Sequence, residues 1–260
     1  MQLGRFGKPM RYTNDDMTST SPLAQEVAQS LLDVQSPPAG HASDMASFFK
    51  AYEGGYGKDD QFLGITVPVI RRVAKQYRTL SLPDVEQLLD SQWHEVRQVG
   101  LTIMADQSKS KRTPDDYRKE IYDLYLRRTD AVNNWDLVDT SCYNIVGMYL
   151  LSHPEQRMIL SELAHSKNIW ERRIAMVSTW QLIREGQLDE TFTVATMLLN
   201  DKHDLIHKAV GWMLREAGKR DEARLRLFLT AHIRQLPRTS LRYAIERFAP
   251  EDRAYFLKLK

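Results

Sequence analysis

Apolar residues recur through most of the chain at the three- and four-residue spacing of a helix face. Leu23, Val27 and Leu31 begin this pattern, and β-branched residues follow it as well, without the alternation that marks a strand. Short breaks such as Gly186 and Gly218 fall between the runs. The pattern predicts an all-α chain. The helices that we expect cover residues 22–32, 42–52, 69–77, 93–104, 114–125, 134–151, 155–164, 170–184, 190–199, 205–216, 222–233 and 239–246, with another beginning near Ser81.

A second, longer period is superimposed on this pattern. Five segments of similar character each place a charged residue at the same point of a helix, roughly 34 to 42 residues apart, as expected when helix pairs stack into a solenoid. Four of these residues are basic, and one is an acid. We therefore expect an αα-superhelix whose concave, basic groove contains a single carboxylate. The five positions are Arg97, Asp139, Arg173, Lys208 and Arg242.

The bulk composition limits what such a groove can bind. The chain has 260 residues, 42% of them hydrophobic, so it can build one large domain. Its net charge is only +2, so nucleic-acid binding must depend on where the charges lie. No apolar run is long enough to span a bilayer, and a single cysteine, Cys142, fits a reducing compartment. We expect a flexible leader over residues 1–22, one helical domain over 23–260 and a cytoplasmic location.

One group of residues has the composition of a reactive site. Trp135 and Asp139 share a helix face at a spacing of four residues, and Arg173, Lys208 and Trp212 follow in the next two repeats. Indole rings attract cations, arginine matches phosphate, and a carboxylate stabilises developing positive charge. Breaking the glycosidic bond of a base alkylated on a ring nitrogen creates such a charge on the sugar. A structural interpretation stays open, in which Asp139 pairs with Arg173 and the tryptophans only pack.

Other signals in the sequence do not indicate a site. His203 and His207 have the spacing of a helical zinc pair, but no third ligand follows, so we expect no metal. The sequence fixes no histidine beside Cys142, which we expect to be a small buried residue. The loop over residues 54–58 lacks the pattern of a phosphate-binding loop, although its Tyr56 could touch DNA.

Several segments in order resemble the AlkD-type DNA alkylation repair family, over about residues 48–248. They are 62–71 (FLGITVPVIR), 134–139 (NWDLVD), 170–175 (WERRIA), 208–216 (KAVGWMLRE) and 237–246 (PRTSLRYAIE). The resemblance implies a HEAT-like repeat glycosylase that excises positively charged N3- and N7-alkylated purines without flipping the nucleotide into a base pocket. It implies that Asp139 is the catalytic aspartate and that Arg173 lies beside the phosphate. It also implies that Trp135 and Trp212 contact the lesion nucleotide.

The residues and the resemblance together predict a monofunctional DNA glycosylase that acts on duplex DNA containing alkylated bases. We expect it to be a monomer that hydrolyses the glycosidic bond without a cofactor, a metal or a membrane partner. Two other classes stay open: a non-catalytic protein that binds DNA structures, and a helical-repeat scaffold for other proteins. The residues that we expect to contact DNA are Lys208, Arg242, Arg97, Arg71 and Tyr56.

Overall fold

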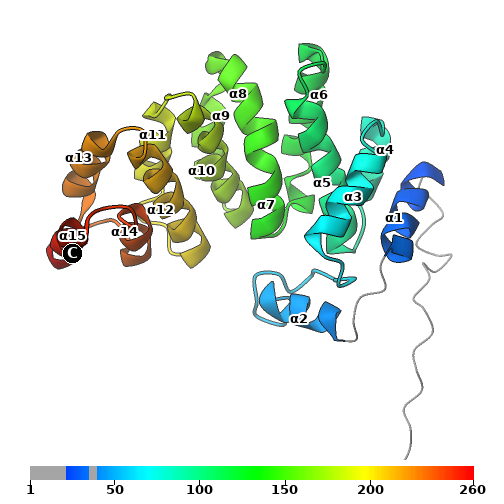
Figure 1. Ribbon diagram of the computed structural model, residues 1–260, viewed down its shortest axis with the longest axis horizontal. Coiled ribbons are helices and arrows are strands. Elements are labelled where there is room, and N and C mark those ends of the chain that lie inside the picture. The colour runs from blue at the N-terminus through cyan, green and yellow to red at the C-terminus, as the bar shows by residue number, and fades with distance from the viewer. Residues whose placement is uncertain (1–21, 35–39) are drawn as a thin grey trace, which may run out of the picture.

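The computed structural model describes residues 22–34 and 40–260 of the chain (Figure 1). These residues form helices joined by short loops, and no strand occurs among them, which confirms the all-α prediction. None of the helices in these two ranges is both long and apolar enough to cross a membrane. The predicted leader, apart from its last residue Pro22, lies outside the described residues. The single domain over 23–260 stays a prediction.

Six helices form a row in which each helix packs against the next. We call it the main row. Its members are α3 (Val67–Gln76), α5 (His94–Lys109), α7 (Trp135–Cys142), α10 (Ile169–Arg184), α12 (Asp204–Gly218) and α14 (Arg238–Ala244). A second set of helices packs against the main row, and its members are α1 (Pro22–Val34), α4 (Leu82–Leu89), α6 (Asp115–Arg127), α9 (Met158–Ala164), α11 (Asp189–Met197) and α13 (Glu222–His232). Helix pairs therefore follow one another along the arc in Figure 1, as in a solenoid.

The buried apolar side chains form one continuous core that runs from α1 to the last helix of the chain. A single helix pair cannot bury its apolar face alone, so each pair depends on its neighbours. Two glycines permit a close approach of the backbones of neighbouring helices. A Cβ atom on Gly147 would lie 2.5 Å from the carbonyl oxygen of Ser178, and one on Gly211 would lie 2.6 Å from that of Ser240. Larger residues at these positions would push α10 and α14 away from their neighbours.

The structure departs from the predicted helices in two places. The expected helix over 134–151 is divided into α7, a π-helix (Tyr143–Gly147) and α8 (Met148–Ser152). Such π-helical turns often lie near functional sites. The final helix, α15 (Pro250–Leu259), is absent from the sequence-based expectation. Phe256 is its one buried residue, so its sequence carries no apolar stripe.

Helix α2 (His41–Phe48) has no buried residue and lies apart from both sets of helices, below α3 and α5 in Figure 1. Residues 49–66 lead from α2 back to α3. We call these residues the connecting segment. Several of its side chains reach the start of α5 and α7, so this segment contributes to the candidate site.

Candidate functional site

A buried carboxylate fixes the connecting segment against α5. Glu95, in the first turn of α5, accepts hydrogen bonds from the backbone N–H groups of Leu63, Gly64 and Ile65, at 2.9, 2.8 and 3.1 Å to the nearest oxygen. Gly64 has a φ of 83°, a conformation that glycine adopts without strain. The backbone donors satisfy a carboxylate that has no exposure to solvent. The end of the segment is therefore held at the beginning of the helix.

Asp60 is the centre of a second buried network, which joins the same segment to α5 and α7. Its Oδ1 pairs with the guanidinium group of Arg97. Its Oδ2 lies 3.0 Å from His94 Nδ1 and accepts a hydrogen bond from Asn134 Nδ2 at 3.1 Å. The other ring nitrogen of His94 lies 2.8 Å from Asp136 Oδ2. A chain of alternating charges thus connects three parts of the molecule that are far apart in the sequence.

Mutual pairing sets the charges of this network. Burial acts to lower the pKa of His94, but the carboxylates of Asp136 and Asp60 raise it to about 9. The imidazole is therefore protonated at neutral pH. Burial acts to raise the pKa of Asp60, but hydrogen bonds and charges from His94 and Arg97 lower it to about 2. Because the His94 side chain is fully buried, its charge stabilises the fold and does not meet a ligand.

Trp135 begins α7 among aromatic rings. Asn134 caps the helix by accepting a hydrogen bond from the Trp135 N–H at 2.9 Å, which ties this helix to the buried network. The indole lies 5.5 Å from the ring of Phe49 and 5.9 Å from that of Phe48, measured between centroids. Phe48 is 65% exposed although it touches other rings. Phe48 therefore exposes an aromatic ring beside the start of α7.

Tyr56 connects Trp135 to the next two helices of the main row. Its ring centroid lies 5.8 Å from that of Trp170 on α10 and 6.3 Å from that of His203, which precedes α12. Burial raises the pKa of the Tyr56 phenol, against a hydrogen bond with the Trp135 indole and the positive charge of Lys208. Tyr56, Trp135 and Lys208 therefore lie in one neighbourhood.

Asp139 lies one helical turn after Trp135 and forms a bidentate ion pair with Arg173 on α10. The Nε–Oδ1 distance is 2.8 Å and the Nη2–Oδ2 distance is 2.7 Å. Arg173 also donates a hydrogen bond to the carbonyl oxygen of Leu205 on α12. Burial raises the pKa of Asp139, and the pair with Arg173 opposes this rise. Asp139 therefore does pair with Arg173, as a purely structural role for the two residues would require. The Asp139 side chain is nevertheless 15% exposed, so it still reaches solvent.

A second aromatic group lies on the other side of Asp139. Tyr143 follows Asp139 by one turn, and its ring lies 4.5 Å from that of Trp180 on α10. Trp180 lies 6.5 Å from Trp212 on α12. Within the described residues, no ring contact joins Trp212 to Trp135. The two predicted tryptophans therefore belong to two groups, and Asp139 lies between these groups along the helix.

Three of the predicted DNA contacts carry exposed charges. Lys208 keeps 41% of its side-chain exposure and pairs with Asp204 at 2.7 Å. Arg242 and Arg71 are exposed and have no ion pair within the described ranges. Arg71 lines a pocket of about 390 Å³ between α3, α5 and α7, which also includes Thr140, the neighbour of Asp139. These three cations are therefore accessible to a ligand.

Arg97 differs from the other basic residues. It is buried, and its guanidinium group pairs with Asp60 and donates to the carbonyl oxygens of Ser91 and Ala131 at 2.8 and 3.3 Å. The structure corrects the expectation that Arg97 lines an exposed surface. The reason is the connecting segment, whose carboxylate covers and neutralises this arginine.

The buried network and two of the aromatic side chains, Phe48 and Trp170, are site residues that we do not predict from the sequence. His94 and Asp136 each follow a tryptophan and occupy the same position of successive repeats, which is the signal that could have found them. Asp60 lies in a loop without periodicity, so no sequence signal points to it. Phe48 and Trp170 stand in apolar patterns that are also typical of core residues.

No group of three or more His, Cys, Asp or Glu side chains in residues 22–34 and 40–260 could hold a metal ion. His203 and His207 make local contacts instead, with the Leu205 N–H at 3.2 Å and the Asp201 carbonyl oxygen at 2.6 Å. Burial raises the pKa of the Cys142 thiol well above its ordinary value, so this residue is not a thiolate nucleophile.

Comparisons with known proteins fit this geometry. No curated protein matches the chain. A solved structure of a predicted DNA alkylation repair enzyme from Enterococcus faecalis has a similar fold, with a TM-score of 0.65 at 17% identity over 82% of this chain and 97% of that chain. At this identity the likeness shows the fold alone. The model of the DNA alkylation repair enzyme family matches residues 28–248. Because this match spans most of the sequence, the chain belongs to the DNA alkylation repair enzyme family.

Proposed function

We propose that the protein is a monofunctional DNA glycosylase that acts as a monomer on duplex DNA. It would hydrolyse the bond between the sugar and a positively charged N3- or N7-alkylated purine. Family membership supports a role in the repair of alkylation damage. The glycosylase activity is supported by one observation, the position of the Asp139 carboxylate. Arg173 holds this carboxylate one helical turn from Trp135, and the carboxylate still reaches solvent. No cofactor or metal takes part in this proposal.

Asp139 would stabilise the charge that develops on the sugar. The alkylated base already carries a positive charge, so the electrons of the breaking C1′–N bond return to the base and it leaves as a neutral molecule. The sugar then has oxocarbenium character, which a nearby carboxylate stabilises. A water molecule adds to C1′, and Asp139 accepts its proton. The raised pKa of Asp139 brings this carboxylate closer to the range in which a base can accept that proton.

Arg173 would act by positioning Asp139. Its guanidinium group is already engaged by both oxygens of Asp139 and by the carbonyl oxygen of Leu205. A bidentate pair fixes the plane of the carboxylate as well as its distance. We therefore propose that Arg173 orients the carboxylate of Asp139. This role differs from the phosphate contact that the family resemblance implies for Arg173.

The aromatic side chains would contact the lesion nucleotide. A cationic purine is attracted to the faces of Trp135 and its neighbour Phe48, and this attraction increases when water is excluded. Trp212, in the second aromatic group, would contact the nucleotide from the other side of Asp139. The carboxylate reaches solvent at the surface of the helix row, so the damaged nucleotide could be engaged without entering a base pocket.

The phosphates would be held by the exposed cations. Arg71, Lys208 and Arg242 lie on three helices of the main row and are accessible to a strand that crosses them. Tyr56 adds a hydroxyl group between Trp135 and Lys208. Together these residues would form the basic, concave groove that the sequence predicts. Arg97 takes no part, because it is buried and paired.

The test is the release of bases from duplex DNA that carries N7-methylguanine and N3-methyladenine. We expect free methylated purines and abasic sites, without strand cleavage. The released bases are measured by chromatography, and a duplex without alkylation is the control. Failure to release any alkylated base would overturn the proposal.

A non-catalytic DNA-binding protein is the second candidate. One observation favours it: the charge of Asp139 is already balanced by Arg173, as in a structural ion pair. This candidate predicts binding of the same duplex, weakened by salt, with no base released. Duplex binding measured beside the excision assay therefore separates the two candidates.

A further inference from the structure

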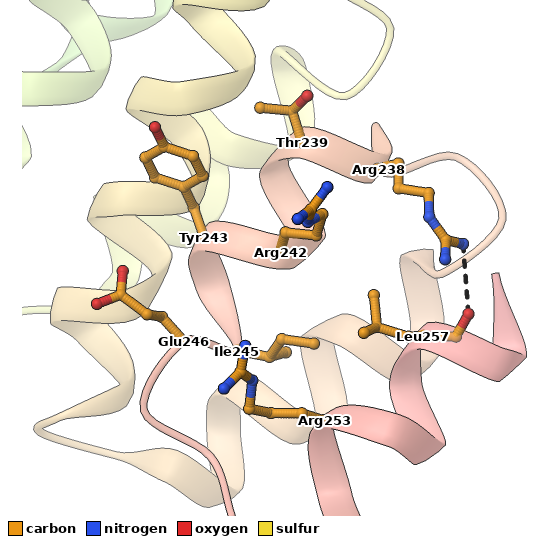
Figure 2. A pocket seen from close by; sticks show the side chains of 8 residues that line it. All are labelled: Arg238, Thr239, Arg242, Tyr243, Ile245, Glu246, Arg253 and Leu257. Atoms are coloured by element: carbon orange, nitrogen blue, oxygen red, sulfur yellow. Dashed lines mark hydrogen bonds between the residues drawn. The ribbon is translucent and has the colours of Figure 1, made fainter. Parts of the chain in front are cut away.

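A pocket of about 440 Å³ lies between α14 and α15, at the end of the array that is far from α7 (Figure 2). Three arginines line it: Arg238 and Arg242 on α14, and Arg253 on α15. Thr239 and Tyr243 complete its polar lining on α14, and Figure 2 shows Arg242 and Arg253 on two different helices of the pocket. The volume is within the range of ligand pockets and exceeds the needs of one ion.

The charge of this pocket is not balanced by the protein. Glu246 is the one carboxylate in its lining, and this side chain pairs with Arg215. Within the described residues, Arg242 and Arg253 have no ion pair or hydrogen bond from their side chains. Arg238 donates one hydrogen bond to the carbonyl oxygen of Leu257 at 3.3 Å, which leaves most of its donors free. Arginines that share one pocket without a counterion favour the binding of an anion.

Many arginines on the surface of the array pair with a carboxylate on another helix or nearby in the sequence. Examples of such pairs are Arg127 with Glu86, Arg128 with Asp90, Arg157 with Glu190, Arg172 with Asp201, Arg224 with Asp189 and Arg226 with Asp252. Within the described residues, Arg242 and Arg253 lack such a partner, a property that they share with other exposed arginines such as Arg71.

A chain of side-chain contacts leads from the pocket to Lys208 on α12. Thr239 donates a hydrogen bond to Asp204 Oδ1 at 3.2 Å, and Asp204 Oδ2 pairs with Lys208 at 2.7 Å. Lys208 also lies within electrostatic range of both Tyr243 and Tyr56. Lys208 therefore lies near both the pocket residue Tyr243 and Tyr56 of the candidate site. Tyr243 is 37% exposed and offers part of its ring to a ligand.

We propose that this pocket binds a nucleotide through its phosphate group. The phosphate lies against Arg242 and Arg253, and the sugar or base lies against the ring of Tyr243. Guanidinium groups match the geometry of phosphate oxygens, and a tyrosine ring stacks on any base. We assign this nucleotide to the DNA strand that extends from the Asp139 site past Lys208. This assignment rests on the proposed glycosylase function. A free mononucleotide has the same chemistry and is the other source.

The test compares wild type with the double variant Arg242→Gln/Arg253→Gln. Duplex affinity is measured by fluorescence anisotropy over a range of salt concentrations, and deoxyadenosine monophosphate is titrated by calorimetry. We expect the double variant to bind duplex about tenfold more weakly, with a log–log salt slope smaller by about 2, because each lost phosphate contact lowers the slope by about 1.

Arg247→Gln is the matched control, because Arg247 is also exposed, follows α14 and does not line the pocket. It should change duplex affinity by less than about twofold, as expected for one unspecific surface charge. Loss of mononucleotide binding with unchanged duplex affinity would support the pocket and identify free nucleotide as its ligand. Loss of duplex affinity in a protein that excises no base would support the pocket while refuting the glycosylase. If the double variant binds both ligands like wild type, the pocket proposal is overturned.

Discussion

Arg97 on α5 and Arg173 on α10 occupy matching positions in the repeat, yet they have different surroundings. Both are 5% exposed, and both pair with an aspartate. The side chain of Asp60, the partner of Arg97, is fully buried, whereas that of Asp139, the partner of Arg173, keeps 15% exposure. The same kind of ion pair is therefore closed in one repeat and open to solvent in another.

The difference comes from the connecting segment. It covers the beginning of α5, where Glu95 holds its backbone and Asp60 enters the charge network. It reaches α7 and α10 with aromatic side chains such as Phe49 and Tyr56, which add no charge to the pair. The same repeat position is therefore buried at Arg97, where the connecting segment supplies a carboxylate, and partly exposed at the Arg173 pair, where it supplies aromatic rings.

The largest expected effect is on the closed pair. Arg97→Met would leave Asp60 buried without its guanidinium partner, so we expect the free energy of unfolding to fall by about 3–5 kcal/mol. Urea denaturation measures this change. Arg127→Met is the control, because Arg127 makes an exposed pair with Glu86, and it should lower stability by less than about 1 kcal/mol. Equal stability of the two variants would show that the closed network is unimportant for the fold.

A pH dependence should follow from the same network. The pKa of His94 rises from 6.5 to about 9 on folding, so its contribution is complete below pH 6.5 and is lost as the pH rises through 9. This shift corresponds to about 3 kcal/mol. The pKa of Asp60 falls from 3.8 to about 2, so its contribution is complete above pH 3.8 and is lost toward pH 2. Urea denaturation between about pH 6 and pH 10 should show the alkaline loss in wild type and not in His94→Gln. Parallel curves would refute the charged state of His94.

The open pair should affect activity more than stability. Arg173→Lys keeps the positive charge but loses the planar fork that orients Asp139, so we expect excision to slow by about 10- to 100-fold. Stability should fall much less than in Arg97→Met, because lysine keeps a positive charge beside the carboxylate of Asp139. Single-turnover excision and urea denaturation of the same variant measure both effects. A large loss of stability with unchanged excision would place Arg173 in the same structural class as Arg97.

The smallest effect is expected at Lys208, another member of the repeated row. Lys208→Gln should weaken duplex binding a few-fold and lower the log–log salt slope by about 1, because one phosphate contact is lost. Lys119 is a matched control, since it also makes an i,i+4 ion pair but lies on α6, outside the main row. Lys119→Gln should leave the slope unchanged. Equal slopes for the two variants would remove Lys208 from the DNA contacts.

The fold could be predicted from the sequence because each main-row helix buries a face against its neighbours. Burial of that face requires apolar residues at helical spacing, and this spacing is visible in the sequence. The same reasoning misses α15, which buries Phe256 alone. It also misses the division of the helix over 134–151, because a π-helical turn leaves the apolar pattern nearly unchanged.

The site could be predicted only in part. Trp135 and Asp139 are neighbours on one helix, so their proximity follows from spacing, and the repeat brings Arg173 to the next helix. The Asp60 network could not be predicted, because its contacts span 34 and 42 residues and begin in a loop. The burial of Arg97 depends on that loop. Repeat position alone therefore does not tell a buried arginine from a reactive one.

The most direct test of the central proposal is the single-turnover excision rate of Asp139→Asn on duplex DNA that contains N7-methylguanine, with duplex affinity measured on the same sample. Asparagine keeps the size of the side chain and one acceptor for Arg173, but it removes the negative charge. We expect the rate to fall by at least about 100-fold, as for the loss of a group that stabilises transition-state charge, while affinity stays equal or rises. Excision at the wild-type rate would contradict a catalytic role for Asp139.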